Sequence, residues 1–132
     1  AAVLGALLPN LDAWNRRRKE IYEIYRSTAR GRVRYLRHGS GDYVAHLAVV
    51  MAEDREALKR HLVSWEIGCD IHYPVLDCDQ VGWLNLPSRI IDGGLATSRR
   101  CIGKILSLPC YPTMTDAEIE QVHDALNAWE NA

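Results

Sequence analysis

The feature that most constrains the fold is a nearly uninterrupted apolar stretch at residues 43–50, YVAHLAVV, in which valine occurs three times. Valine favours strands because its branched side chain packs well on a pleated surface. A strand that is apolar on both faces has to be covered on both, so the stretch predicts a central strand. Shorter runs at 33–36 and 105–108 predict further strands, and the turn-rich HGSGD segment at 38–42 precedes the central one.

Three longer segments repeat apolar residues at spacings of three and four, the period of a helix with one buried face. They are residues 11–30, 54–67 and 115–129, and a shorter helix is predicted at 97–104. Asp54 is a suitable N-cap for the second helix, and Gly68 is expected to supply the left-handed turn that ends it. Thr115 and Glu118 have the spacing of a capping box, in which two side chains satisfy free amides at a helix start.

A fourth strand is predicted at 69–73, because Pro74 cannot donate a hydrogen bond to a sheet and would end it. From residue 75 to 94 the periodic pattern is lost, which is typical of a functional loop or of a partly disordered one. Together the helices and strands predict a single two-layer α+β domain over the 132 residues. None of the apolar runs is long enough to cross a membrane.

Charge is distributed unevenly along the chain, although the net charge is only −1. Through residue 37 there are nine Lys or Arg and three Asp or Glu, whereas the remainder has seven and fourteen. Such asymmetry is found in faces that bind nucleic acid or another polyanion. It also arises when the two halves neutralise each other on folding, or when the basic part faces further protein. The sequence pI of 6.6 favours these two alternatives, so nucleic acid is not the expected partner.

The cysteines are candidate metal ligands. Cys69 and His72 have the C-x-x-H spacing of a metal-binding pair, and Cys78 follows. On a strand, however, Cys69 and His72 point to opposite faces, and the second close pair of a zinc site is missing. Metal binding is therefore not expected. All four cysteines are expected to be free thiols in a reducing cytosol.

His72 and Tyr73 stand where the predicted strand runs into the long loop, a place where rigid scaffolds present functional groups. The alternative is a packed His–Tyr pair that closes the strand. His46 is expected to be a core histidine. The lysines are expected to be solvated rather than activated for Schiff-base chemistry: Lys19, Lys59 and Lys104. The sequence holds no nucleophile motif and no phosphate-binding glycine loop, so no complete catalytic set is expected in this chain.

Three blocks of the sequence form an ordered set: AAVLGALLPNLDAWNRRRKEIYEIYR, DREALKRHLVSWEIGCDIHYPV and ILSLPCYPTMTDAEIEQV. In this order they resemble the C-terminal part of the DegT/StrS-type nucleotide-sugar aminotransferases, which are fold-type-I enzymes dependent on pyridoxal 5'-phosphate (PLP). The resemblance covers nearly all of the chain. It implies transfer of an amino group from an amino acid, typically glutamate, to a keto group of a nucleotide-linked sugar.

The resemblance also implies a domain organisation. Residues 1–30 would form a linking helix region, and residues 31–132 an α+β body with a small antiparallel sheet covered by helices. The N-terminal PLP-binding domain, with the Schiff-base lysine, would be absent from this sequence. The isolated chain is therefore expected to be inactive and to bind no coenzyme. Family members are homodimers, so a homodimer is expected for the full-length protein, and its expected location is the cytoplasm.

Only a few site residues can be transferred from the family. His72 and Tyr73 match its His-Tyr pair on the sugar-nucleotide side of the active site, and Gln80 matches a following glutamine. Leu76 and Cys78 stand where many members have a proline and a histidine. This difference is expected for a subgroup of the family that acts on a different sugar. The alternative from another functional class is a stand-alone binding or interaction module for a polyanionic partner.

Overall fold

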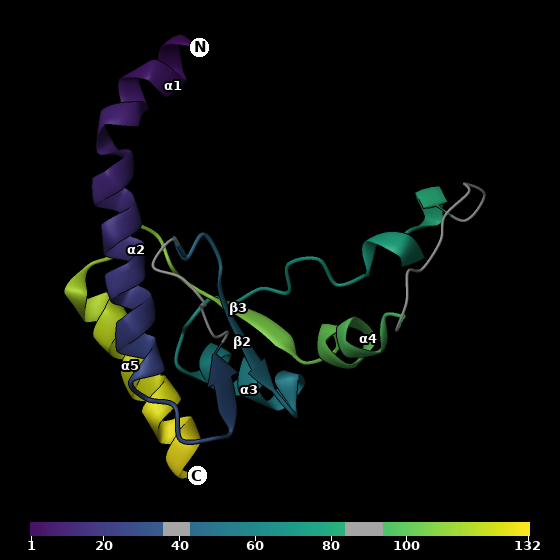
Figure 1. Cartoon of the computed structure of the whole chain (residues 1–132). Coiled ribbons are helices and arrows are strands. Elements are labelled where there is room, and N and C mark those ends of the chain that lie inside the picture. The colour runs from purple at the N-terminus through teal and green to yellow at the C-terminus, as the bar shows by residue number, and fades with distance from the viewer. Residues whose placement is uncertain (36–42, 84–93) are drawn as a thin grey trace.

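The computed structural model describes residues 1–35, 43–83 and 94–132. Its α-helices are Ala2–Leu7 (α1), Leu11–Arg26 (α2), Arg55–Ser64 (α3), Ala96–Ile102 (α4) and Asp116–Asn131 (α5). Its strands are Val33–Tyr35 (β1), Ala48–Ala52 (β2) and Ile105–Leu108 (β3), and short 3₁₀ helices lie at Leu8–Asn10 (η1), Asp77–Asp79 (η2) and Val81–Trp83 (η3). The strands form an antiparallel sheet in the order β1-β2-β3, which confirms the predicted α+β class (Figure 1).

β2 is the central strand, as the apolar stretch predicts, and Val50 pairs with Tyr35 on one side and Leu106 on the other. The strand nevertheless begins at Ala48 rather than at residue 43. Ala45 has a φ of 48°, and this left-handed conformation interrupts an extended chain. His46 next to it is exposed, so the prediction of a core histidine is wrong.

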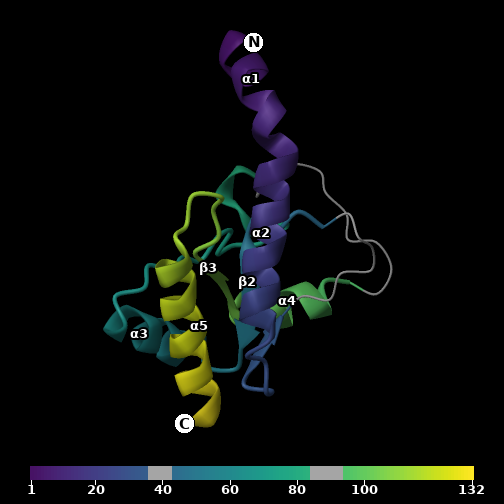
Figure 2. The same ribbon diagram turned by 90° about the vertical axis from the view of Figure 1, so that its left-hand side faces the viewer.

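Helices α2, α3 and α5 cover the sheet and supply much of the core. Figure 2 shows α2 and α5 side by side in front of the sheet, with α3 beside α5. Figure 1 places α4 on the other side of the sheet from α2 and α5. The fully buried large side chains come from three helices and the sheet: Ile21, Tyr22 and Tyr25 of α2, Leu58 and Leu62 of α3, Leu126 of α5, and Val33, Val50 and Leu106 of the strands. The helix predicted for residues 11–30 is shorter and ends at Arg26.

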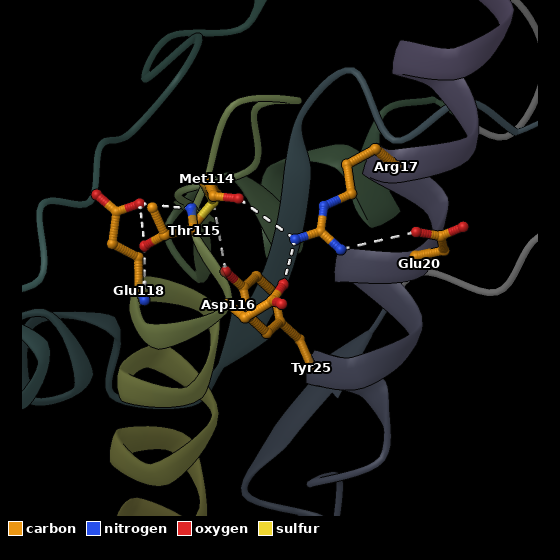
Figure 3. Close-up of polar contacts among 7 residues, drawn as sticks. All are labelled: Arg17, Glu20, Tyr25, Met114, Thr115, Asp116 and Glu118. Carbon is orange, nitrogen blue, oxygen red and sulfur yellow. Dashed lines mark hydrogen bonds and ion pairs between the residues drawn. The ribbon is translucent and has the colours of Figure 1, made fainter.

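The start of α5 is joined to the middle of α2 by polar contacts (Figure 3). One Nη of Arg17 donates to the Met114 carbonyl oxygen at 3.3 Å and to the Asp116 carboxylate at 2.5 Å. The Tyr25 hydroxyl donates to the Pro109 carbonyl oxygen at 3.1 Å, and burial raises its pKa. Asp116 is in the first turn of α5, where a negative charge also interacts favourably with the helix dipole.

Both predicted helix caps are present. The Asp54 carboxylate accepts a hydrogen bond from the Ala57 amide at 2.8 Å at the start of α3. Thr115 and Glu118 form the capping box, in which each side chain accepts a hydrogen bond from the other residue's amide. The Thr115 amide and hydroxyl donate to the Glu118 carboxylate at 2.7 and 2.8 Å, and these two bonds lower the pKa of the Glu118 carboxyl.

The prediction that Gly68 ends α3 in a left-handed turn is wrong. That conformation belongs to Glu66, with a φ of 59°. The Glu66 amide donates to the Val63 carbonyl oxygen at 2.9 Å, and the Ile67 amide donates to the Leu62 carbonyl oxygen at 3.0 Å. These bonds form a Schellman motif, which satisfies carbonyl groups at the end of a helix.

The remaining predicted elements agree with the structure to different degrees. The strand at 105–108 and the short helix before it are confirmed, the helix as Ala96–Ile102. The strand predicted at 69–73 is wrong, because this segment forms only an isolated bridge between Asp70 and Ser107. The turn at 38–42 and residues 84–93 of the long loop lie outside the described residues.

Part of the positive charge of the N-terminal half is neutralised within the fold. Arg34 of β1 pairs with Glu53 at 2.9 Å, and Arg17 pairs with Asp116. The Arg32 guanidinium lies 4.2 Å from the centre of the Trp129 ring. These contacts agree with the alternative in which the two halves of the chain compensate each other.

Candidate functional site

The predicted site residues follow the point where the chain leaves the sheet. Asp70 bridges to β3: its amide donates to the Ser107 carbonyl oxygen at 3.2 Å, and its carbonyl oxygen accepts a hydrogen bond from the Ser107 amide at 2.8 Å. Two residues later His72 and Tyr73 are both exposed, and their ring centres are 6.5 Å apart. The alternative of a packed pair that closes a strand is therefore wrong.

Tyr73 has an unusual backbone conformation for a bulky residue. Its φ is 58°, in the left-handed region, and its side chain is 75% exposed. This conformation costs an L-residue about 1–2 kcal/mol, and the core does not offset it here because the ring is outside the core. Residues with such strained backbones are concentrated at active sites and ligand sites, where the surrounding structure holds them in place.

Tyr73 and Gln80 line one open hollow of about 450 Å³, together with Pro74, Val75, Asp79 and Val81. The structure thus brings together two of the three predicted residues, whereas His72 is beside Tyr73 but does not line the hollow. The phenol hydroxyl and the side-chain amide both donate and accept hydrogen bonds. With the apolar Val75 and Val81 beside them, they suit a ligand that has hydroxyl groups and an apolar face.

Asp79, on the same hollow, forms an ion pair that the sequence analysis missed. Two Arg99 nitrogens of α4 donate to its two carboxylate oxygens at 2.7 and 3.0 Å. These bonds lower the pKa of the Asp79 carboxyl and raise that of Arg99. The Cys78 thiol contacts the same carboxylate at 3.6 Å. No local pattern links two residues that are twenty positions apart, so the sequence carried no signal for this pair.

The cysteines are all free, in agreement with the prediction. Burial raises the pKa of the Cys69 thiol and raises that of Cys110 to about 11. Cys69 and His72 are not on a strand, so the prediction that they point to opposite faces of one is wrong. Within the three described ranges, no group of three His, Cys, Asp or Glu side chains is placed to hold a metal ion.

None of the three lysines is among the residues that line this hollow. Lys104 follows α4 and pairs with Glu53, and this pairing lowers the pKa of the Glu53 carboxyl. Lys19 of α2 and Lys59 of α3 are partly exposed on their helices. A coenzyme held as a Schiff base needs a desolvated lysine in its pocket, so the residues lining the hollow do not fit PLP by themselves.

Comparison with known proteins identifies the family. The model of the DegT/DnrJ/EryC1/StrS aminotransferase family matches residues 1–127. The chain belongs to this family. The DegT/StrS-type resemblance of the sequence blocks is therefore confirmed.

Members of the aminotransferase family with similar sequences include two sugar transaminases. The chain is 31% identical over 131 residues to the dTDP-3-amino-3,6-dideoxy-alpha-D-galactopyranose transaminase of Aneurinibacillus thermoaerophilus, covering 98% of this chain and 35% of that protein. It is 32% identical over 140 residues to the dTDP-3-amino-3,4,6-trideoxy-alpha-D-glucose transaminase of Streptomyces venezuelae, covering 98% and 34%. The chain thus spans about a third of the length of these relatives.

Solved structures share the fold of this chain. The crystal structure of S. venezuelae DesV in complex with a ketimine intermediate matches with a TM-score of 0.85 at 29% identity, over 99% of this chain and 36% of that one. A family member from Brucella abortus matches with a TM-score of 0.87 at 23% identity, over 99% and 35%. The predicted fold, a small antiparallel sheet with covering helices, is confirmed. The roles of His72, Tyr73 and Gln80 remain predictions.

None of the helices within the described residues is long and apolar enough to span a bilayer.

Proposed function

We propose that this chain is the small C-terminal domain of a PLP-dependent sugar aminotransferase. The full-length enzyme would transfer an amino group from an amino acid to a keto group of a nucleotide-linked sugar. The observation that carries the proposal is the family match over residues 1–127, from a chain that spans only a third of its sugar-transaminase relatives. PLP, when bound, stabilises the carbanion that amino transfer requires.

The domain organisation is part of the proposal: a linking helix region at 1–30, an α+β body at 31–132, and a large PLP-binding domain N-terminal to both. Figure 1 shows α1 projecting beyond the sheet and its helices. Neither α1 nor η1 has a buried residue, and Val3, Leu4 and Leu8 are 73%, 73% and 65% exposed. An apolar helix face of this kind fits packing against the large domain, in a homodimer of full-length subunits.

The proposed role of the hollow is to form the sugar-nucleotide wall of the active site. Tyr73 and Gln80 would exchange hydrogen bonds with sugar hydroxyls or phosphate oxygens, and His72 would contact the same ligand from the neighbouring position. The apolar side chains of the hollow would pack against the sugar or the base. This chain would contribute no catalytic residue, so the Schiff-base lysine would belong to the large domain. The free thiols support a cytoplasmic location.

The test compares the 132-residue chain with the full-length protein. Each is supplied with PLP, glutamate and a dTDP-linked keto-deoxysugar, and formation of 2-oxoglutarate is measured. The full-length protein is expected to turn over and the chain alone to be inactive. Turnover by the chain alone, or borohydride fixation of PLP to Lys19, Lys59 or Lys104, would contradict the proposal.

A stand-alone module for a polyanion is the less favoured function, because Arg17 and Arg34 are paired within the fold. A salt titration separates the two functions, since a protein that binds a phosphate backbone loses affinity steeply as salt rises.

A further inference from the structure

Residues 76–83, which carry Gln80, reach away from the body of the domain. In Figure 1 the teal segment leaves the sheet and passes above α4. Neither η2 nor η3 has a buried residue. The Asp79 amide donates to the Leu76 carbonyl oxygen and the Trp83 amide to that of Gln80, both at 2.9 Å. These hydrogen bonds close short turns within the segment. A segment that is held only by such local bonds unfolds locally at a small free-energy cost.

The Asp79–Arg99 ion pair joins this segment to α4. Its two hydrogen bonds fix the direction of the carboxylate as well as its distance. Gln80 is the next residue along the chain and, like Asp79, lines the hollow. Orienting Asp79 therefore restricts where the Gln80 side chain can point.

α4 is itself tied to the sheet and to α3, so Arg99 projects from an anchored element. An Arg55 nitrogen of α3 donates to the Ile102 carbonyl oxygen at 3.2 Å. The Ala52 amide of β2 donates to the carbonyl oxygen of Lys104, just after α4, at 3.0 Å. A connected path thus runs from the core through α4 to the wall of the hollow.

We propose that the Asp79–Arg99 ion pair is a positioning pair, which holds Gln80 in line with Tyr73 before a nucleotide sugar binds. The inference rests on the proposed function of the hollow. The Arg99 and Asp79 side chains are 52% and 38% exposed, and pairs this exposed contribute little to global stability. The effect of the pair is therefore local: it raises the fraction of molecules in which Gln80 is already placed to bind the ligand.

The first test measures local order in the 132-residue chain. Arg99→Gln removes the pair, and Arg100→Gln is the matched control, because the Arg100 side chain donates to the Thr97 hydroxyl of its own helix at 3.4 Å. Hydrogen exchange at the Gln80 and Trp83 amides should become about three- to tenfold faster in R99Q and stay unchanged in R100Q. Equal exchange in both variants, with equal melting temperatures, would overturn the positioning role whatever the function of the hollow.

The second test uses the full-length protein. If Gln80 is correctly placed in only a fraction of the molecules, the apparent affinity for the nucleotide sugar is reduced by that fraction. R99Q should therefore raise KM for the nucleotide sugar about three- to tenfold. The kcat and the coenzyme absorption should not change. If exchange speeds up in R99Q while KM stays constant, the hollow does not contact the sugar nucleotide, and that part of the proposed function fails.

A charge exchange distinguishes positioning from direct contact between Arg99 and a ligand phosphate. The double variant with Asp79→Arg and Arg99→Asp restores the pair with its polarity reversed. It should recover KM to within about twofold of the unmodified enzyme, whereas either single change should not. No recovery in a folded double variant would overturn the inference.

Discussion

Tyr73 combines a strained backbone with an exposed phenol. Its φ of 58° is in the left-handed region, and core packing does not offset the strain because the side chain is 75% exposed. His72 beside it is exposed as well. Both side chains are thus available to a ligand, and a conformation that core packing does not stabilise fits a role in binding.

Tyr73→Phe in the full-length enzyme tests that role. Loss of one hydrogen bond, worth about 0.5–1.5 kcal/mol, should raise KM for the nucleotide sugar about two- to tenfold. Thermal stability should not change. The control is Tyr111→Phe, at another exposed tyrosine. Equal KM values for the two variants would rule out a contact between the Tyr73 hydroxyl and the ligand.

Cys110 is the residue for which we predict a pH effect. Its half-buried thiol contacts the Arg18 and Ala45 carbonyl oxygens at 3.6 and 3.7 Å, and burial raises its pKa from 9.0 to about 11. Between these values the unfolded chain releases a proton that the folded chain keeps. The free energy of unfolding should therefore fall as pH rises through this window.

Cys110→Ala should make the decrease in the free energy of unfolding with rising pH smaller. Cys78→Ala, at an exposed thiol, should leave this decrease unchanged. Urea unfolding between pH 8.5 and 10 measures it, before buried tyrosines such as Tyr35, with a pKa raised from 10.0 to about 12, contribute strongly. Parallel curves for both variants would contradict the assignment to Cys110.

At the scale of elements, helix α3 offers a sharp stability prediction. Glu66 has the left-handed conformation at the end of α3, and its side chain is exposed. Glu66→Gly should stabilise the protein by about 1 kcal/mol, because glycine adopts this conformation without strain. Gly68→Ala is the paired variant: Gly68 has no positive φ, and an added Cβ meets no atom within 4 Å. It should be neutral or slightly stabilising, and calorimetry measures both; a destabilised E66G variant would be contrary to this account.

Elements set by local signals were predictable from the sequence, and those set by distant partners were not. Thr115 and Glu118 determine the start of α5 within four residues, and the 105–108 strand is found as predicted. The segment at 69–73 has strand-like residues but only Asp70 pairs with the sheet. Period-two patterns do not reveal whether a neighbouring strand is available.

The candidate site shows the same division. His72, Tyr73 and Gln80 were predicted through the family resemblance, and two of them line one hollow. Arg99 was not predicted, because its partner Asp79 is brought near only by the path of the chain in space. Ion pairs between separate elements depend on tertiary structure, which spacing rules do not encode.

For the molecule as a whole, Glu130 connects the two ends of the body. Its buried carboxylate, at the end of α5, accepts hydrogen bonds from the Val33 amide at 2.7 Å and the Arg32 amide at 3.1 Å. The Arg32 guanidinium also donates to the Trp129 carbonyl oxygen at 2.5 Å. The start of β1 therefore depends on the last turn of α5.

Glu130→Ala should destabilise the protein by about 1–3 kcal/mol, because two amides at the start of β1 lose their acceptor. Glu130→Gln keeps one acceptor oxygen and should cost less. Glu120→Ala, at an exposed position of the same helix, is the control and should change the free energy of unfolding by less than about 0.5 kcal/mol. Urea unfolding at pH 7 measures all three, and equal values for E130A and E120A would contradict the link.

The dependence of β1 on Glu130 has a consequence for synthesis on the ribosome. The Val33 amide of β1 is made 97 residues before the Glu130 carboxylate that accepts its hydrogen bond. The edge of the sheet can reach its final state only after this last turn has left the exit tunnel. Until then β2 and β3 can pair, but the first amides of β1 lack their acceptor, so the sheet is expected to be completed only after α5 has been made.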